Sequence, residues 1–244
     1  MNRTVSIDEA DTPLALSNTS PDSKEIEDFI YLISHDVRNS VRALIELPQW
    51  IVEDLEQAGV KIDGPVAESI DLMNRHTGRL DRMLVDLLTF SRIGRMQKIE
   101  TVDVGAALDD VLEDARIPPG FQVSRELECT EVRMGERDFL TLLTSLISNA
   151  VKHNEAATGR IIISCRRDGA HVLVSVSDDG PGIPHAYRDR VFGVMTTLKP
   201  RDEVEGSGMG LAIVRKIAKI YHGDAKVIEN GNGTGITLEV KLEA

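Results

Sequence analysis

Cysteines and aromatic residues are scarce in this sequence. Its 244 residues contain two cysteines, one tryptophan and only 4% aromatic residues. Cys129 and Cys165 do not have the spacing of metal ligands, and so few cysteines make no disulfide framework. We therefore expect a protein of the reducing cytoplasm, with Cys165 as a small core residue because it lies in an apolar, strand-like run.

Long hydrophobic runs and an excess of positive charge are also missing. No apolar run approaches about 18 residues, so we expect no membrane span. Residues 1–23 do not have the basic start and apolar stretch of a signal peptide. The formal net charge is -12, which argues against non-specific binding to nucleic acid or to an anionic membrane. What remains, 41% hydrophobic and 28% charged residues, is the ordinary balance of folded domains.

The residue pattern divides the chain into three parts. Residues 1–23 mix Asp, Thr, Ser and Pro with little periodicity, which predicts a disordered leader. Residues 24–96 carry apolar residues three or four apart in two stretches, which predicts a helical hairpin with a turn at 58–65 and a kink at Pro48. Residues 97–244 alternate between strand-like and helical patterns, which predicts a mixed sheet with helices on one face.

Each helix of the predicted hairpin has one apolar stripe along its length. Two helices of roughly thirty residues cannot bury both stripes as a lone hairpin. Pairing with a second copy of the chain, as a four-helix bundle, would bury them and predicts a homodimer. Packing of the stripes on the rest of the same chain is the alternative.

The stretch around His35 gives the first functional hypothesis. Apolar residues such as Val37 and Val41 belong to the stripe, whereas His35 and Asn39 lie off it and share a solvent-facing side of the helix. A titratable nucleophile is thus presented by a helix, with Asp36 beside it and an amide one turn further on. A surface histidine on an amphipathic helix is the alternative when this stretch is taken alone.

A second candidate site lies at the end of an amphipathic helix predicted for residues 136–153. Asn149 offers a hard amide oxygen, which suits Mg2+. Lys152 and His153 offer donors that suit phosphate oxygens. Taken alone, these residues also fit an exposed helix end.

Two glycine-containing motifs follow. In Asp178-Asp-Gly-Pro-Gly182, the first carboxylate follows a strand and can accept a hydrogen bond from an exocyclic amine such as that of adenine. Gly180 and Gly182 let the backbone approach a flat ring. Gly206-Ser-Gly-Met-Gly210 opens a helix, and glycine-rich backbone at a helix N-terminus favours phosphate binding. Taken singly, the first also fits an ordinary turn, and the second is not a dinucleotide fingerprint because no short βαβ unit precedes it.

In their order along the chain, these motifs resemble the catalytic core of sensor histidine kinases of two-component systems. The resemblance covers about residues 24–244. The matching elements are the phosphoacceptor box (His35–Asn39), the N box (Asn149–Lys152), the G1 box (Asp178–Gly182), the F box (Phe192), the G2 box (Gly206–Gly210) and a final glycine–threonine element (Gly231–Thr234).

The resemblance implies a dimerisation and phosphotransfer hairpin, residues 24–96, followed by a Bergerat-type ATP-binding α/β sandwich, residues 97–244. It implies that Asp178 reads the adenine amine, through a water shared with Thr234, and that Asn149 holds Mg2+. Lys152 and His153 would help to hold the phosphates of ATP, and 185–207 would be a mobile ATP lid. The glycines implied in nucleotide binding are Gly180, Gly182, Gly206, Gly208 and Gly210.

The resemblance also implies the chemistry of the hairpin. His35 would attack the γ-phosphate of ATP as the neutral imidazole, which predominates at pH 7. Asp36 would accept the proton of the other ring nitrogen. Asn39 resembles the residue that orients a water for dephosphorylation of a partner regulator. We therefore expect autophosphorylation, transfer to an aspartate of a response regulator, and phosphatase capacity.

Three positions depart from the family pattern: Ser40 replaces the usual proline, Ser145 replaces a frequent Asn, and Met195 replaces the second F-box aromatic residue. Two other function classes stay open. Related ATPases use a glutamate four residues before the metal-binding Asn, but that position is Ser145 here. A non-catalytic phosphotransfer or scaffold protein would tolerate a degenerate ATP site, against which the intact Asn149 and Asp178 argue.

Overall fold

The computed structural model describes residues 21–95, 97–154, 156–198, 206–230 and 235–243, without the side chains of residues 21–36 and 39. The predicted disordered leader therefore lies almost wholly outside the described residues. Thr234, the last residue of the predicted glycine–threonine element, lies outside them as well.

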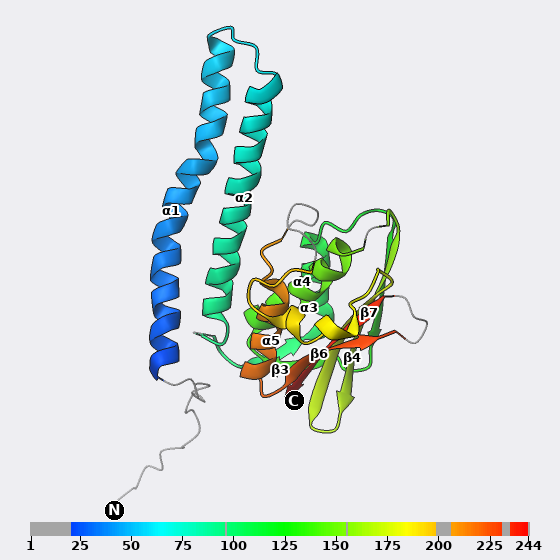
Figure 1. Ribbon diagram of the computed structural model, residues 1–244. Coiled ribbons are helices and arrows are strands. Elements are labelled where there is room, and N and C mark those ends of the chain that lie inside the picture. The colour runs from blue at the N-terminus through cyan, green and yellow to red at the C-terminus, as the bar shows by residue number, and fades with distance from the viewer. Residues whose placement is uncertain (1–20, 96, 155, 199–205, 231–234, 244) are drawn as a thin grey trace, which may run out of the picture.

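Two long helices form the predicted hairpin. Helix α1 spans Pro21–Gln57 and helix α2 spans Gly64–Arg92, and they lie side by side along most of their length (Figure 1). Pro48 lies inside α1, which continues through it as one curved helix. The turn contains Gly59, with φ +71°, and Gly64, with φ +53°, a backbone region that glycine adopts without steric cost.

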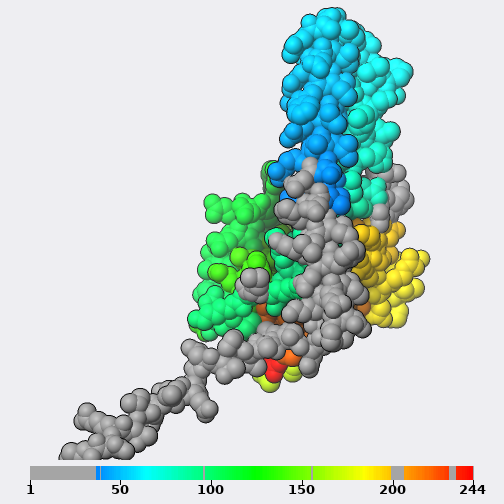
Figure 2. Space-filling view, turned by 90° about the vertical axis from the view of Figure 1, so that its left-hand side faces the viewer, coloured from blue at the N-terminus to red at the C-terminus, as the bar shows by residue number. Residues whose placement is uncertain are grey.

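The upper part of the hairpin stands clear of the rest of the chain (Figure 2). Val41, Leu84 and Leu88 are buried, but eleven large apolar side chains in the described part of the hairpin are more than a third exposed. The exposed ones are Val37, Leu44, Ile45, Leu47, Trp50, Ile51, Val60, Val66, Leu72, Met73 and Leu80. Packing on the same chain, the alternative considered above, therefore does not cover this surface.

The rest of the chain is an α/β sandwich. Its main sheet has five strands in the order β2-β4-β5-β7-β6, with β2 parallel to β4 and every other pair antiparallel. A separate antiparallel pair joins β1 to β3. The strands are β1 (Glu100–Asp103), β2 (Phe121–Leu127), β3 (Glu131–Met134), β4 (Gly159–Asp168), β5 (His171–Asp178), β6 (Asp224–Glu229) and β7 (Ile236–Glu243). This confirms the predicted mixed sheet.

Three helices cover one face of the main sheet: α3 (Val104–Asp114), α4 (Glu136–Lys152) and α5 (Gly210–Ile220) (Figure 1). Helix α4 is the central helix of the three and contacts both α3 and α5. One side of it is apolar at helical spacing and is buried in the core. Strand β4 meets the helices with alternate residues, Ile161 and Ile163, which are 0% and 1% exposed. The helices therefore lie on one side of the sheet, as the pattern predicts.

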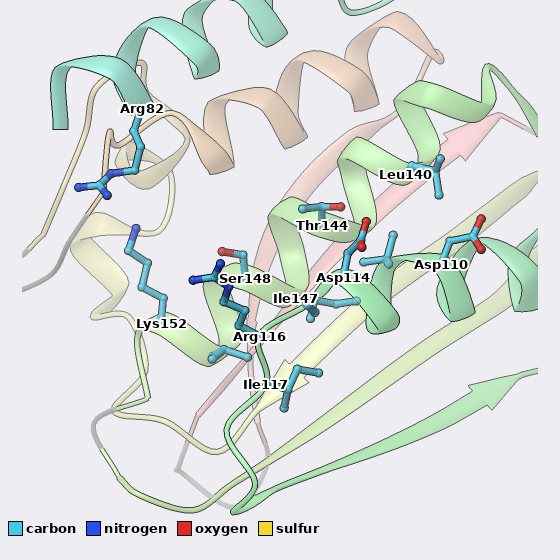
Figure 3. Close-up of a pocket in the computed structure, with 13 residues that line it drawn as sticks. Arg82, Asp110, Asp114, Arg116, Ile117, Leu140, Thr144, Ile147, Ser148 and Lys152 are labelled. Atoms are coloured by element: carbon cyan, nitrogen blue, oxygen red, sulfur yellow. The ribbon is translucent and has the colours of Figure 1, made fainter. Parts of the chain in front are cut away.

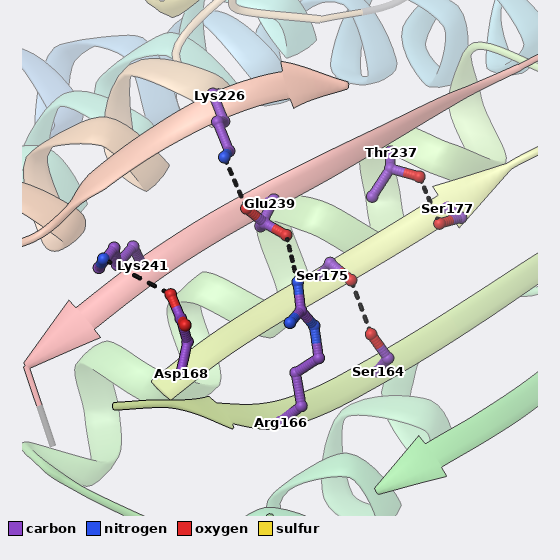
Figure 4. A network of polar contacts seen from close by, with 9 residues as sticks. All are labelled: Ser164, Arg166, Asp168, Ser175, Ser177, Lys226, Thr237, Glu239 and Lys241. Atoms are coloured by element: carbon purple, nitrogen blue, oxygen red, sulfur yellow. Dashed lines mark hydrogen bonds and ion pairs between the residues drawn. The ribbon is translucent and has the colours of Figure 1, made fainter. Parts of the chain in front are cut away.

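The opposite face of the main sheet carries a network of polar side chains, and no helix of the described residues covers it (Figure 4). Ser164 and Ser175 are hydrogen-bonded across β4 and β5 at 2.7 Å. Glu239 of β7 lies between two cations, Lys226 at 2.9 Å and Arg166 at 3.3 Å. These cross-strand pairs stabilise register without needing a covering layer.

Polar contacts fix the end of α2 to the α/β sandwich. Asp138 of α4 is 2% exposed and accepts hydrogen bonds from the Gly94 amide and the Tyr221 hydroxyl, both at 2.9 Å. Burial raises the pKa of Tyr221, which keeps its hydroxyl protonated and able to donate. Lys216 of α5 donates to the Phe90 carbonyl at 2.7 Å and lies 4.4 Å from the Phe90 ring centre. The last turn of α2 is therefore held against α4 and α5.

No helix within the described ranges is both long enough and apolar enough to cross a membrane.

We expect replacement of Leu146 by alanine to weaken the α/β sandwich strongly. Leu146 of α4 is fully buried, so Leu146→Ala leaves a cavity and should lower the free energy of unfolding by about 2–5 kcal/mol. Leu198→Ala is the matched control, because Leu198 is 41% exposed and a surface change of this kind shifts stability by about 0.5 kcal/mol at most. Urea denaturation followed by circular dichroism measures both variants. Equal effects of the two substitutions would contradict the described core.

Candidate functional site

Asp178 is the last residue of strand β5, the middle strand of the main sheet, and it is half-buried. Its Oδ1 accepts a hydrogen bond from the Gly180 amide at 2.9 Å, and the Ile236 amide also donates to its carboxylate. Burial raises the pKa of Asp178 above the usual carboxyl range, and the two backbone donors partly offset this by favouring the charged form. The result is an acceptor held in a weakly solvated position.

Neighbouring groups hold the backbone of Asp178. The Asn230 side chain donates to the Asp178 carbonyl at 2.8 Å, and Thr237 donates to the Asn230 side-chain oxygen at 2.8 Å. The Gly235 backbone has φ +73° and packs so closely on the Asp178 carbonyl that any Cβ would collide with it. Sequence reasoning did not single out Asn230 or Thr237, although Asn230 directly precedes the glycine-rich turn.

The motif that begins at Asp178 contacts the end of α4. Asp179 Oδ1 accepts hydrogen bonds from the Asn154 side chain at 3.0 Å and from the Arg160 amide at 2.9 Å. A Cβ on Gly180 would lie 3.5 Å from the His153 carbonyl. The N-box and G1-box elements of the sequence are therefore adjacent in space, although about 30 residues separate them.

The predicted N-box residues occupy the last turn of α4. Asn149 is half-buried, and its carbonyl accepts the hydrogen bond of the His153 amide, which caps the helix at 3.1 Å. Lys152 and His153 are exposed. The Lys152 ammonium lies against Gly206, because any Cβ at Gly206 would collide with Nζ. This contact brings the glycine loop to the same end of α4.

The glycine loop enters helix α5 with a backbone that requires glycine at one position. Gly208 has φ +75°, and a Cβ there would lie 2.8 Å from the Thr196 carbonyl and from the Met195 carbonyl carbon. Gly210, the first residue of α5, has open space around its Cβ position. Ser207 is buried, and its hydroxyl accepts a hydrogen bond from the Met209 amide at 3.0 Å. The loop is thus built tightly against the segment that precedes it.

The predicted lid, 185–207, is described as far as residue 198 and again from 206. It begins with two short 3-10 turns, His185–Tyr187 and Arg190–Phe192. Phe192 is 4% exposed, and the Arg215 guanidinium lies 4.4 Å from its ring centre. The predicted F-box residue therefore anchors the first part of this segment on α5.

Helix α1 contains His35, Asp36 and Asn39, as the periodicity predicts. Their side chains are outside the described part of the structure, so their predicted roles stay predictions. Thr234 falls outside it too, and its predicted contact with adenine stays a prediction for the same reason.

A groove of about 810 Å3 runs beside this site, between α3, α4 and the Arg82 side chain of α2 (Figure 3). It shares Lys152 and Ser148 with the last turns of α4, but neither Asp178 nor a glycine of the predicted motifs lines it. At the Lys152 end, Arg82 of the hairpin lies near Lys152 (Figure 3). Because Arg82 and Lys152 both line this groove, α2 lies next to the end of α4.

Comparison with known proteins matches this architecture. Residues 134–244 match the family described as "Histidine kinase-, DNA gyrase B-, and HSP90-like ATPase". Over 219 residues, 86% of this chain, the sequence is 30% identical to the methanogenesis regulatory histidine kinase FilI of Methanothrix harundinacea, of which it covers 24%. Over 221 residues, 88% of the chain, it is 29% identical to cyanobacterial phytochrome A of Nostoc sp., of which it covers 28%. The chain thus spans about a quarter of the length of these relatives.

Solved structures share the fold. The full-length ShkA structure in complex with AMPPNP superposes with a TM-score of 0.65 at 23% identity, over 89% of this chain and 46% of that chain. The histidine kinase ThkA in complex with the response regulator protein TrrA gives 0.60 at 19% identity, over 90% and 63%. The solved structures show a shared fold, and the sequence matches support the resemblance of this chain to the catalytic core of sensor histidine kinases, with a histidine kinase-, DNA gyrase B- and HSP90-like ATPase match at residues 134–244.

Proposed function

We propose that this chain autophosphorylates His35 from Mg-ATP and passes the phosphoryl group to an aspartate of a response regulator. The observation that carries this proposal is the convergence of three motifs at the end of α4. The turn after Asp178 contacts His153, and the loop at Gly206 contacts Lys152. Such an arrangement provides an acceptor for a base amine on one side and donors for phosphates on the other.

Asp178 would recognise the adenine ring. Its carboxylate accepts from the Gly180 and Ile236 amides, and a carboxylate has further lone pairs for the exocyclic amine of adenine. Gly182, with φ +79°, leaves its side of the turn without a side chain, so a flat ring can approach the backbone. Asn230 and Gly235 support this reading because they fix the Asp178 backbone.

The phosphates of ATP would lie between the end of α4 and the glycine loop. Lys152 and His153 carry donors there, and the α5 N-terminus adds a favourable dipole. Within the described residues, no group of three or more His, Cys, Asp or Glu side chains is arranged to hold a metal ion. That fits Mg2+, which is bound mainly through phosphates and water, with the Asn149 amide oxygen as its protein ligand. When bound, Mg2+ would neutralise charge on the phosphates.

The transfer step needs one nucleophile and one proton acceptor. One ring nitrogen of His35 would form the N–P bond to the γ-phosphorus while the bond from that phosphorus to the leaving ADP oxygen breaks. The proton on the other ring nitrogen would pass to Asp36, its neighbour in sequence. The separation between α1 and the nucleotide site means that the two parts must approach each other for this step.

A response regulator is the proposed acceptor of the phosphoryl group. The likeness to ThkA, solved in complex with a response regulator protein, supports a partner of this class. Asn39, one helical turn after His35, would orient water for dephosphorylation of the same partner. The division into a leader (1–23), a hairpin domain (24–96) and an ATP-binding domain (97–244) is part of this proposal.

Two copies of the chain would form a homodimer through the hairpin. The support is the row of exposed apolar side chains on α1 and α2, away from the α/β sandwich. Contiguous apolar surface of this kind marks association sites in proteins. A four-helix bundle made by two hairpins buries it without any further element.

We expect His35→Gln to abolish the acid-labile, alkali-stable label that the chain acquires from γ-labelled ATP. Glutamine cannot form the N–P bond of a phosphoimidazole. His76→Gln is the matched control, because His76 is an exposed histidine on the other helix of the hairpin. This variant should keep the label. An ATPase would instead release phosphate without labelling the protein, and a scaffold protein would do neither.

We expect Gly208→Ala to abolish ATP binding and to lower the melting temperature. An L-residue with φ near +75° is strained, and the new Cβ would clash with backbone of residues 195 and 196. Gly210→Ala should keep the melting temperature of the parent, because its Cβ position is open. Calorimetric titration with ATP and thermal melting measure the pair. Normal ATP affinity in Gly208→Ala would contradict the proposed loop.

We expect the double substitution Ile51→Glu and Met73→Glu to convert the dimer to a monomer. Both side chains are more than 40% exposed on the hairpin, and charges there would be buried in a bundle core at high cost. Val194→Glu is the control, since Val194 is an exposed apolar residue of the α/β sandwich. Light scattering coupled to size-exclusion chromatography reports the mass. A parent protein that is monomeric at micromolar concentration would refute the proposal.

A further inference from the structure

Arg215 of α5 lies across the segment that precedes the glycine loop. Its guanidinium lies 4.4 Å from the centre of the Phe192 ring, which is a cation–π contact. The same group donates to the Asp189 carbonyl at 3.4 Å and lies 3.8 Å from the Asp189 carboxylate. Because Asp189 and Phe192 stand at the two ends of the second 3-10 turn, one side chain holds both ends of that turn.

The placement of the Arg215 side chain has a cost. Its Nε atom is buried and has no hydrogen-bond partner among the described residues. A buried donor without a partner is unfavourable, and such groups are uncommon in folded proteins. Here the contacts of the guanidinium with the Phe192 ring and with Asp189 compensate for it. The side chain is therefore held in one position although one of its donors is not satisfied.

Successive turns connect this contact with the residues that face the glycine loop. The Gly193 amide donates to the Arg190 carbonyl at 3.0 Å, and the Thr196 amide donates to the Gly193 carbonyl at 3.3 Å. Between them, Met195 has φ +56°, a left-handed backbone that is uncommon for a residue with a side chain. The backbone from the 3-10 turn to Thr196 is thus a short connection of consecutive hydrogen-bonded turns.

The end of this connection packs on Gly208. A Cβ at Gly208 would lie 2.8 Å from the Thr196 carbonyl oxygen and 2.9 Å from its amide nitrogen, so the two backbones are in direct contact. Arg215 therefore supports the glycine loop indirectly, because it holds the segment on which Gly208 packs. The loop in turn leads into α5, the helix that carries Arg215, so these contacts form a closed ring.

We propose that Arg215 is a positioning residue for phosphate binding: by holding residues 189–196 it fixes the backbone of the glycine loop, and it acts through that backbone without contacting the nucleotide. This inference rests on the proposed function, because it assumes that the phosphates of ATP bind at that loop. Other groups hold the adenine side of the site, since Asn230 and Gly235 fix Asp178. Loss of Arg215 therefore weakens the contacts with the phosphates and leaves the recognition of adenine unchanged.

The test compares the affinity of the full chain for AMPPNP with Mg2+, by calorimetric titration, with its affinity for adenosine, by NMR titration. Arg215→Gln removes the cation and its contact with the ring. We expect it to weaken AMPPNP binding about 5- to 20-fold, the range of an ordinary coupling between sites, and to leave adenosine binding at the parental value. Arg215→Lys keeps a cation near the ring and should restore most of the AMPPNP affinity.

Phe192→Leu is a second variant, which keeps an apolar side chain but removes the ring. It should weaken AMPPNP binding in the same way. The double variant with Arg215→Gln should bind no more weakly than either single variant, because both substitutions break the same contact. Lys219→Gln is the matched control. Lys219 lies one turn further along α5 and pairs with Asp224 at 3.1 Å, so the loss of its charge should leave both affinities unchanged.

Parental AMPPNP affinity in Arg215→Gln, or additive losses in the double variant, would overturn the inference. An equal loss of AMPPNP and adenosine affinity in Arg215→Gln would overturn it as well, because Arg215 would then only stabilise the domain. Failure of the proposed function looks different. In that case the parent chain would not bind AMPPNP, or Asp178→Asn would bind it as tightly as the parent.

Discussion

The close approach of Gly235 to the Asp178 carbonyl is the constraint on which the site depends. Strands β5 and β7 are neighbours, and their pairing puts the end of one beside the start of the other. Only a residue without a Cβ fits between them, because a side chain would overlap the Asp178 backbone. Asn230 and Thr237 then close the gap with hydrogen bonds. The carboxylate is aimed by the sheet, so its direction does not depend on a flexible side chain alone.

Helix α4 connects that carboxylate with the glycine loop. Its buried face packs in the core, and this close packing fixes the position of its last turn. From that turn, His153 meets the Asp178 motif and Lys152 meets the glycine loop. A single rigid helix thus sets the spacing between the Asp178 motif and the glycine loop. The end of this helix sets the positions of the N-box residues.

The hairpin is joined to this framework mainly through polar contacts. Asp138 and Lys216 bind backbone groups at the end of α2, and the Tyr221 hydroxyl donates to Asp138. Interfaces of this polar kind suit domains that change their relative position, because their groups find new partners in water. Large apolar surface is instead left on the far part of the hairpin, where a second copy would cover it. The two surfaces therefore suit two different kinds of contact.

Much of the secondary structure could be predicted from the sequence. The turn of the hairpin and the helix at Glu136–Lys152 lie within a residue or two of their expected limits, since strong apolar periodicity specifies the helices. Gly208 was predicted as a phosphate-binding glycine, and its backbone angle adds the reason that no other residue fits. Asn230 and Thr237 were not predicted, because the Asp178 backbone that they hold lies far away in the sequence.

By itself, the sequence determined the order of elements, the family resemblance and the positions of the candidate motifs, since these depend on local spacing and residue type. Only the tertiary structure decided that the three downstream motifs meet at one end of α4. Local periodicity fixes which face of an element is buried. It contains no information on which distant side chain fills the neighbouring space, because that depends on how the packed elements are placed relative to one another.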